Sequence, residues 1–85
     1  MIRMTVFLGI HKLVPGMSET DVREGYEKYK QGAVAKGLKP LGAVVSMEKG
    51  FAYCQTEAQS AQEVKEAHEG AAVPLEDVVE VKTLG

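Results

Sequence analysis

The alternation of strand-like and helix-like patterns restricts the fold of this chain more than any single motif does. Hydrophobic periodicity and cap residues predict six segments. In chain order these are a strand over residues 5–13, a helix over about 18–36, strands over 41–47 and 51–56, a helix over about 60–68 and a strand over 78–84. Each half of the chain therefore consists of a strand, a helix and a second strand.

This order predicts the split βαβ pattern of the ferredoxin-like fold, a βαββαβ sandwich of the α+β class. Right-handed crossovers place the first and third strands in the centre of a four-stranded antiparallel sheet, with two helices on one face. The caps agree, since Ser18 is followed by Asp21 and Ser60 by Glu63 at the spacing of a capping box. A length of 85 residues suits one domain, which we expect to span residues 1–85.

The first helix carries its buried stripe at three- and four-residue spacing, on Val22, Tyr26, Tyr29 and Ala33. We interpret the two tyrosines as core residues whose hydroxyl groups reach water. Gly25, within the same helix, weakens it by about 1 kcal/mol relative to alanine.

The other face of the predicted sheet has no helix to cover it. We expect Phe7 and His11 to share that face with Phe51 and Tyr53, unless the register turns the odd-numbered positions of the first strand inward. A bare apolar face on so small a domain favours self-association. The sequence therefore predicts a homodimer packed face to face, an association of the dimeric α/β barrel type.

Composition argues against several classes of partner. The formal net charge is −2 and the charges are mixed in sign, whereas a nucleic-acid surface needs clustered lysine and arginine. The apolar run near the N-terminus is too short for a membrane span and lacks a signal-peptide cleavage site. A single cysteine allows no intramolecular disulfide and points to a reducing, cytoplasmic setting. We therefore expect no nucleic-acid partner and no membrane partner.

Two histidines are the leading candidates for chemistry. His11 ends the first strand and His68 ends the second helix, and the predicted topology brings both ends to the same edge of the sheet. Imidazole suits nickel, copper and zinc, so the pair could form the nucleus of a metal site. The alternative is that both rings have structural or solvated roles. Further ligands could come from either helix, from Glu24, Glu27, Glu66 or Glu69.

Cys54 and Glu57 lie on the third strand. A buried, unpaired Cys54 behaves by default as a small apolar residue, and a role as metal ligand or nucleophile needs a base beside it. His11 could be that base if the two strands are neighbours. Glu57 either caps the turn before the second helix or binds a ligand at the edge opposite the histidines.

The segment YCQTEAQSAQEVKEAHEGAAVPLEDVVEV resembles a small ferredoxin-like family, long filed as a domain of unknown function, that includes nickel-binding proteins. The resemblance is carried by Tyr53-Cys54, by Glu57 followed by alanine, by His68 at the end of a helix and by Pro74 before the last strand. It implies a homodimer that binds nickel or a similar divalent ion. The positions that match the family's site are His11, Cys54, Glu57 and His68.

Three functions follow as hypotheses. The first is a homodimeric, non-enzymatic protein that binds a divalent transition metal through His11 and His68. The second is a cofactor-free enzyme similar to small monooxygenases or lactone isomerases, with His11 or His68 as base and Tyr26 as donor, which requires a cavity of a few hundred Å3 between sheet and helices. The third is an interaction module in which the histidines are incidental.

Overall fold

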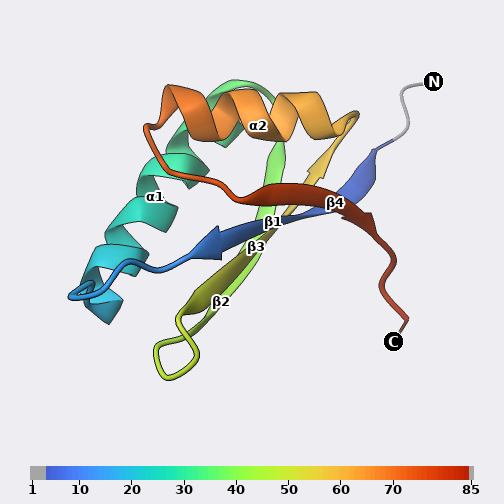
Figure 1. Ribbon diagram of the computed structural model, residues 1–85. Coiled ribbons are helices and arrows are strands. Elements are labelled where there is room, and N and C mark those ends of the chain that lie inside the picture. Colours follow the sequence, from blue (N-terminus) through green and yellow to red (C-terminus); the bar gives the residue numbers. More distant parts are fainter. Residues whose placement is uncertain (1–3, 85) are drawn as a thin grey trace.

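The computed structural model describes residues 4–84 and contains six elements (Figure 1). They are β1 (Thr5–Lys12), α1 (Glu19–Ala35), β2 (Lys39–Ser46), β3 (Phe51–Ala58), α2 (Ala61–Gly70) and β4 (Asp77–Val81). The predicted order is confirmed. The largest difference from the predicted bounds is that β4 ends at Val81, three residues early, and every other end agrees to within two residues.

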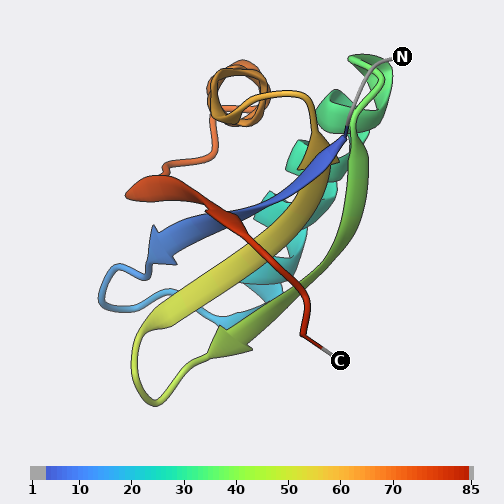
Figure 2. The ribbon, with the colours of Figure 1, turned by 90° about the vertical axis from the view of Figure 1, so that its right-hand side faces the viewer.

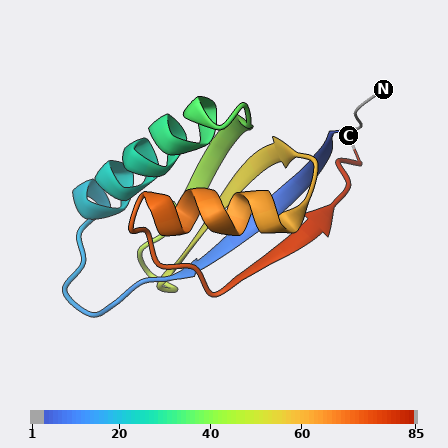
Figure 3. The same ribbon diagram turned by 90° about the horizontal axis from the view of Figure 1, so that it is seen from above.

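The four strands form one sheet in the order β2-β3-β1-β4, and every neighbouring pair is antiparallel. The central strands are β1 and β3, as predicted. Both helices lie over the same face of this sheet, which Figures 2 and 3 show from the end and from above. The protein therefore has a ferredoxin-like α+β fold.

Local sequence sets the ends of the helices. At the start of α1, the Ser18 side chain accepts from the Asp21 amide while the Asp21 carboxylate accepts from the Ser18 amide. At the start of α2, the Ser60 hydroxyl accepts from the Glu63 amide, but the Glu63 carboxylate accepts from the Gln59 amide instead of from Ser60. Both helices are thus capped as the sequence predicts, the second by half of a capping box. Within residues 4–84, neither helix is long and apolar enough to cross a lipid bilayer.

The register of β1 corrects one expectation. His11 pairs with Ala52 and Phe7 with Thr56, so the odd-numbered positions of β1 share a face with the even-numbered positions of β3. That face is the one beneath the helices, where Phe7 belongs to the buried core. Phe7 and His11 therefore do not lie on the bare face, and the alternative that the register turns the odd-numbered positions inward is the one observed. The rings of Phe51 and Tyr53 lie 4.7 Å apart between centroids on the opposite side of β3.

The bare face of the sheet carries mainly apolar side chains, together with polar residues that include Ser46, Gln55, Glu57 and Asp77. Its side chains come from alternate positions of all four strands, and we call it the outer sheet face. Val44 is 63% exposed and Val79 is 37% exposed, while the central residues are half-buried by their neighbours. The apolar residues of the outer sheet face are Val6, Leu8, Ile10, Val44, Phe51, Tyr53, Val79 and Val81.

Candidate metal centre

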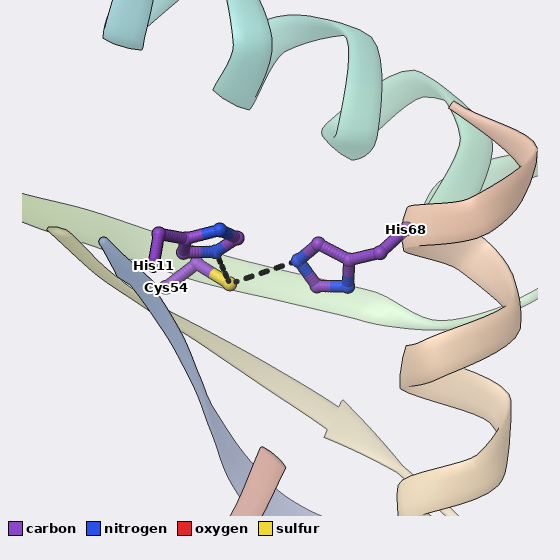
Figure 4. Close-up of side chains that lie close together, drawn as sticks. All are labelled: His11, Cys54 and His68. Atoms are coloured by element: carbon purple, nitrogen blue, oxygen red, sulfur yellow. Dashed lines mark hydrogen bonds between the residues drawn. The ribbon is translucent and has the colours of Figure 1, made fainter. Parts of the chain in front are cut away.

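Three side chains from three elements converge between the sheet and the helices (Figure 4). His11 comes from the end of β1, Cys54 from the middle of β3 and His68 from the last turns of α2. The Cys54 Sγ atom lies 3.4 Å from Nε2 of His11 and 3.5 Å from Nε2 of His68. One nitrogen of each ring and the sulfur all lie within 4.8 Å of one another. The topology therefore brings the two histidines together as the sequence indicated, and Cys54 lies between them.

The other nitrogen of each ring is fixed by the main chain. Nδ1 of His11 lies 2.8 Å from the carbonyl oxygen of Pro74, and Nδ1 of His68 lies 2.8 Å from that of Val64. A carbonyl oxygen can only accept a hydrogen bond, so each Nδ1 carries the hydrogen. In the neutral imidazole Nε2 is then the acceptor, and both acceptors face the Cys54 sulfur.

This arrangement is one hydrogen short. Three lone-pair-bearing atoms meet, and the Cys54 thiol brings the only hydrogen among them. The thiol can donate its hydrogen to only one Nε2 at a time. The other Nε2 then faces the sulfur lone pairs without a hydrogen bond. A proton or a cation among the three atoms would remove this deficit, and burial disfavours the proton because it leaves a charge without a counter-ion.

Burial keeps all three groups uncharged in the absence of a cation. His68 is 1% exposed and Cys54 is 2% exposed. Loss of hydration lowers the pKa of His68 to about 4, and lowers that of His11. The same cause raises the pKa of the Cys54 thiol to about 11. At neutral pH the cluster therefore consists of two neutral imidazoles and one thiol.

The donor set fits a transition-metal ion. In a tetrahedral zinc site, bonds of about 2.3 Å to sulfur and about 2.0 Å to nitrogen place the two donors about 3.5 Å apart. The two sulfur–nitrogen distances in this cluster, 3.4 and 3.5 Å, have that spacing, and the third spacing, between the two nitrogens, is within 4.8 Å. Metal-binding histidines usually donate their second ring N–H to a carbonyl or carboxylate, as both rings do here. Sulfur and imidazole nitrogen favour nickel, copper or zinc over magnesium or calcium.

Two further residues, Tyr29 and Gly9, contact the cluster, and the sequence analysis did not assign either to the site. Tyr29 stacks on His68 with 3.8 Å between ring centroids, and its hydroxyl is hydrogen-bonded to Thr56. Tyr29 is only 1% exposed, so the prediction that its hydroxyl reaches water was wrong. Gly9 pairs with Cys54, and a Cβ atom at Gly9 would lie 2.7 Å from the Cys54 sulfur. An unexplained glycine within a central strand was the available signal for such a close approach.

The structure does not bring Glu57 to the cluster. It lies three positions beyond Cys54 on β3 and therefore on the other side of the strand. Its carboxylate is 3.9 Å from the Lys39 ammonium group on β2. The glutamates considered on the helices are exposed, and within residues 4–84 only His11, Cys54 and His68 group at metal-binding distances.

A cavity of about 330 Å3 adjoins the cluster. All three donor residues line it, together with Tyr26 and Tyr29 of α1. It lies between the sheet and the helices, where the enzyme hypothesis requires one. The cluster is thus at the inner wall of a space large enough for a small molecule.

The fold and the cluster define a class, a small ferredoxin-like α+β protein with a buried His–Cys–His group beside a cavity. The sequence matches no family profile and none of the curated proteins. Among solved structures, the protein is similar to SCO4226 from Streptomyces coelicolor A3(2), with a TM-score of 0.82 and 20% sequence identity over 94% of this chain and 99% of that chain. At this identity the likeness establishes the fold alone.

Proposed function

We propose that this protein binds one divalent transition-metal ion per chain through Nε2 of His11, Sγ of Cys54 and Nε2 of His68. The observation that carries the proposal is that two Nε2 acceptors face one Cys54 thiol, which has a single hydrogen to donate. Two carbonyl groups orient both imidazole lone pairs toward one buried sulfur. A metal ion satisfies all three donor atoms once the thiol releases its proton.

Nickel is the ion we expect first. The resemblance of residues 53–81 to a family with nickel-binding members favours it, and the nitrogen and sulfur donors are compatible with it. The thiol must stay reduced to act as a ligand, which fits a cytoplasmic protein. Copper and zinc are the competitors, since copper binds most N/O/S sites more tightly than nickel does.

Cobalt provides a direct test. The reduced, metal-free protein is titrated with Co2+, and a thiolate-to-cobalt absorption band in the near ultraviolet should saturate at one ion per chain. Ni2+ and Zn2+ should then displace or compete with the cobalt. The Cys54→Ser variant should lack the band, and His11→Ala and His68→Ala should each bind more weakly. Absence of binding by all three ions would refute the proposal.

Glu57→Gln is the matched control. Glu57 belongs to the set that the family resemblance implies, yet it lies on the far side of β3. The variant should bind Co2+ with unchanged affinity and an unchanged spectrum. A large loss of affinity in this variant would show that the proposed set of three ligands is wrong.

We also propose that the protein is a homodimer formed through the outer sheet face. That face has apolar side chains from all four strands among a few polar ones, and no helix lies over it. Covering it with a second copy would bury apolar surface that a monomer leaves in water. This part of the proposal does not depend on metal binding.

A second candidate function is favoured by the cavity. An enzyme without a cofactor would use His11 or His68 as a base and Tyr26 as a donor, and all three residues line the 330 Å3 space. The two functions separate at Cys54, which is essential as a ligand and dispensable for a histidine base. Full turnover of any substrate by a metal-free Cys54→Ser variant would favour the enzyme over the metal protein.

A further inference from the structure

The cavity beside the cluster has a polar end and an apolar body. The polar end consists of His11, Cys54 and His68. The remaining wall is mainly apolar and comes from the loop after β1, from α1, from β2 and from the segment after α2. It also includes two lysines and two acidic residues, Lys12, Lys28, Asp21 and Glu24, whose formal charges cancel. Representative lining residues are Leu13, Met17, Val22, Ala43, Ala52 and Val73.

Small residues keep this space open. Gly25 lies on the inner side of α1, one position before Tyr26, and a Cβ atom there would have nothing within 4 Å. Ala43 on β2 and Ala52 on β3 line the cavity from the sheet. Glycine within a helix costs about 1 kcal/mol relative to alanine, so an ordinary packed core would favour a larger residue here. The sequence thus leaves a void at the position where a side chain would stabilise the helix.

The protein offers three donors to a metal, whereas a closed tetrahedral site has four. Among residues 4–84, no further histidine, cysteine or carboxylate groups with these three donors at ligand distance. The Tyr26 hydroxyl also lines the cavity, but burial raises its pKa, so it stays a neutral phenol. The Tyr29 hydroxyl is hydrogen-bonded to Thr56, and the Asp21 carboxylate accepts from the Ser18 amide at the helix cap. The carboxylate of Glu24 belongs to an exposed residue of α1. A metal held by the cluster would therefore have one coordination position facing the cavity.

Charge indicates what kind of group belongs there. A divalent ion with one thiolate and two neutral imidazoles has a net charge of +1. Two of the three ligands are almost fully buried, and an isolated charge is unfavourable in such surroundings. One monoanionic group makes the centre neutral, a neutral group leaves the charge in place, and a dianion reverses it.

From these observations we propose that the cavity binds a small, largely apolar molecule with a single negatively charged donor group, which lies against the cluster and completes the coordination of its metal. This inference rests on the proposed metal binding. A volume of about 330 Å3 is at the lower end of small-molecule sites and suits one substituted ring or a short chain. Carboxylates, phenolates and thiolates with an apolar body are the chemical class.

Benzoate and benzamide form a matched pair of probes, since they have nearly the same shape and differ in charge. Cobalt-loaded protein is titrated with each while the visible spectrum of the cobalt is recorded, and the titration is repeated by calorimetry on metal-free protein. Benzoate should change the cobalt spectrum and bind the loaded protein at least about tenfold more tightly than benzamide, a difference of about 1.4 kcal/mol. Metal-free protein should show no preference for benzoate.

Gly25→Leu tests the place of binding. The leucine side chain would enter the cavity, and the loss of a helical glycine should keep the variant folded. Its affinity for cobalt should be unchanged, and its affinity for benzoate should fall at least about tenfold, again about 1.4 kcal/mol. Gln31→Leu puts the same side chain at an exposed position of α1 outside the cavity and should change neither affinity. Ala43→Leu fills the cavity from the sheet and serves as a second variant.

The outcomes separate this inference from the proposed function. Cobalt binding without any response to benzoate leaves the metal site standing and overturns the ligand site. Equal binding of benzoate and benzamide, or equal binding of benzoate with and without cobalt, also overturns it. Undiminished benzoate affinity in both cavity-filling variants would place the ligand elsewhere and refute the proposal. Failure to bind cobalt refutes the proposed function and this inference together.

Discussion

Gly9 sets the distance between β1 and the Cys54 sulfur. Replacing it with alanine would place a methyl carbon 2.7 Å from that sulfur and 3.4 Å from Cε1 of His68. The strand cannot retreat, because β1 is hydrogen-bonded on both sides, so the two ligands must move. We expect Gly9→Ala to weaken cobalt binding by about tenfold or more, as disturbance of groups that orient metal ligands does. The cobalt titration described above measures this.

Gly25→Ala is the control for Gly9→Ala. The same substitution at Gly25 meets nothing within 4 Å and removes a helical glycine. It should leave cobalt affinity unchanged and raise the free energy of unfolding by up to about 1 kcal/mol. Equal cobalt affinity in the two variants would show that the close approach at Gly9 has no bearing on the site.

The buried ring of His68 makes the metal-free protein sensitive to acid. Its pKa is lowered from 6.5 to about 4. At pH values between these two, His68 is therefore protonated in the unfolded chain and neutral in the folded chain. Stability from this group is complete above about pH 6.5 and falls as the pH drops toward 4. The loss can reach about 3 kcal/mol, at about 1.4 kcal/mol for each unit of pKa shift. Urea unfolding of the metal-free protein at pH 7 and pH 4.5 measures the change.

His68→Phe isolates that contribution. Phenylalanine keeps a ring against Tyr29 and cannot be protonated. The variant should lose clearly less stability than the original protein between the same two pH values. The carboxylates titrate in both proteins and cancel in the comparison. An identical loss in both proteins would contradict a buried, neutral His68.

At the scale of elements, a hydrogen bond between Tyr29 and Thr56 joins α1 to β3 behind the cluster. Thr56 has no exposed surface, so removal of the tyrosine hydroxyl leaves the threonine hydroxyl without its partner. We expect Tyr29→Phe to lower the free energy of unfolding by about 1–3 kcal/mol while the ring still stacks on His68. Tyr26→Phe is the control and should cost much less, because Tyr26 is only partly buried. Chemical unfolding of both variants gives the comparison.

The elements themselves could be predicted from the sequence because their signals are local. Ser18 caps α1 as expected, and Gly37, just after the end of the helix, adopts the left-handed conformation of a helix stop, with φ of +82°. The facing of β1 could not be predicted in this way. Both faces of β1 are apolar, so hydrophobicity does not indicate which one lies beneath the helices. The register of β1 against β3, with His11 opposite Ala52, determines it.

The candidate site was partly predictable for the same reason. Topology alone brings the ends of β1 and α2 together, which is enough to pair His11 with His68. The position of Glu57 was not predicted. Side chains alternate between the two faces of β3, so Glu57, three positions after Cys54, points to the opposite face. The stacking of Tyr29 on His68 depends on how α1 packs against α2, and it cannot be predicted from the sequence of either helix alone.

At the scale of the whole molecule, the outer sheet face should control assembly. Val44 is 63% exposed there, so Val44→Lys removes apolar contact surface without disturbing the core. If a second copy covers this face, the variant should be monomeric at concentrations where the original protein is a dimer. Analytical ultracentrifugation measures both species.

Val34→Lys is the matched control for Val44→Lys. Val34 is 58% exposed on α1, on the helical side of the sheet, so the same change in charge and volume falls outside the outer sheet face. This variant should remain dimeric. A monomeric original protein at all concentrations, or equal dissociation of both variants, would contradict assembly through the sheet.

The two carbonyl groups that hold the imidazole rings have a consequence for how the protein can change over evolutionary time. Val64 and Pro74 contribute backbone oxygen atoms, so other residues at these positions can supply the same acceptors wherever the local fold is kept. The tautomer of each ring therefore depends on the backbone fold and is independent of the side chain at position 64 or 74. Lineages that share this architecture can diverge widely around the donor atoms and still present them in the same protonation state.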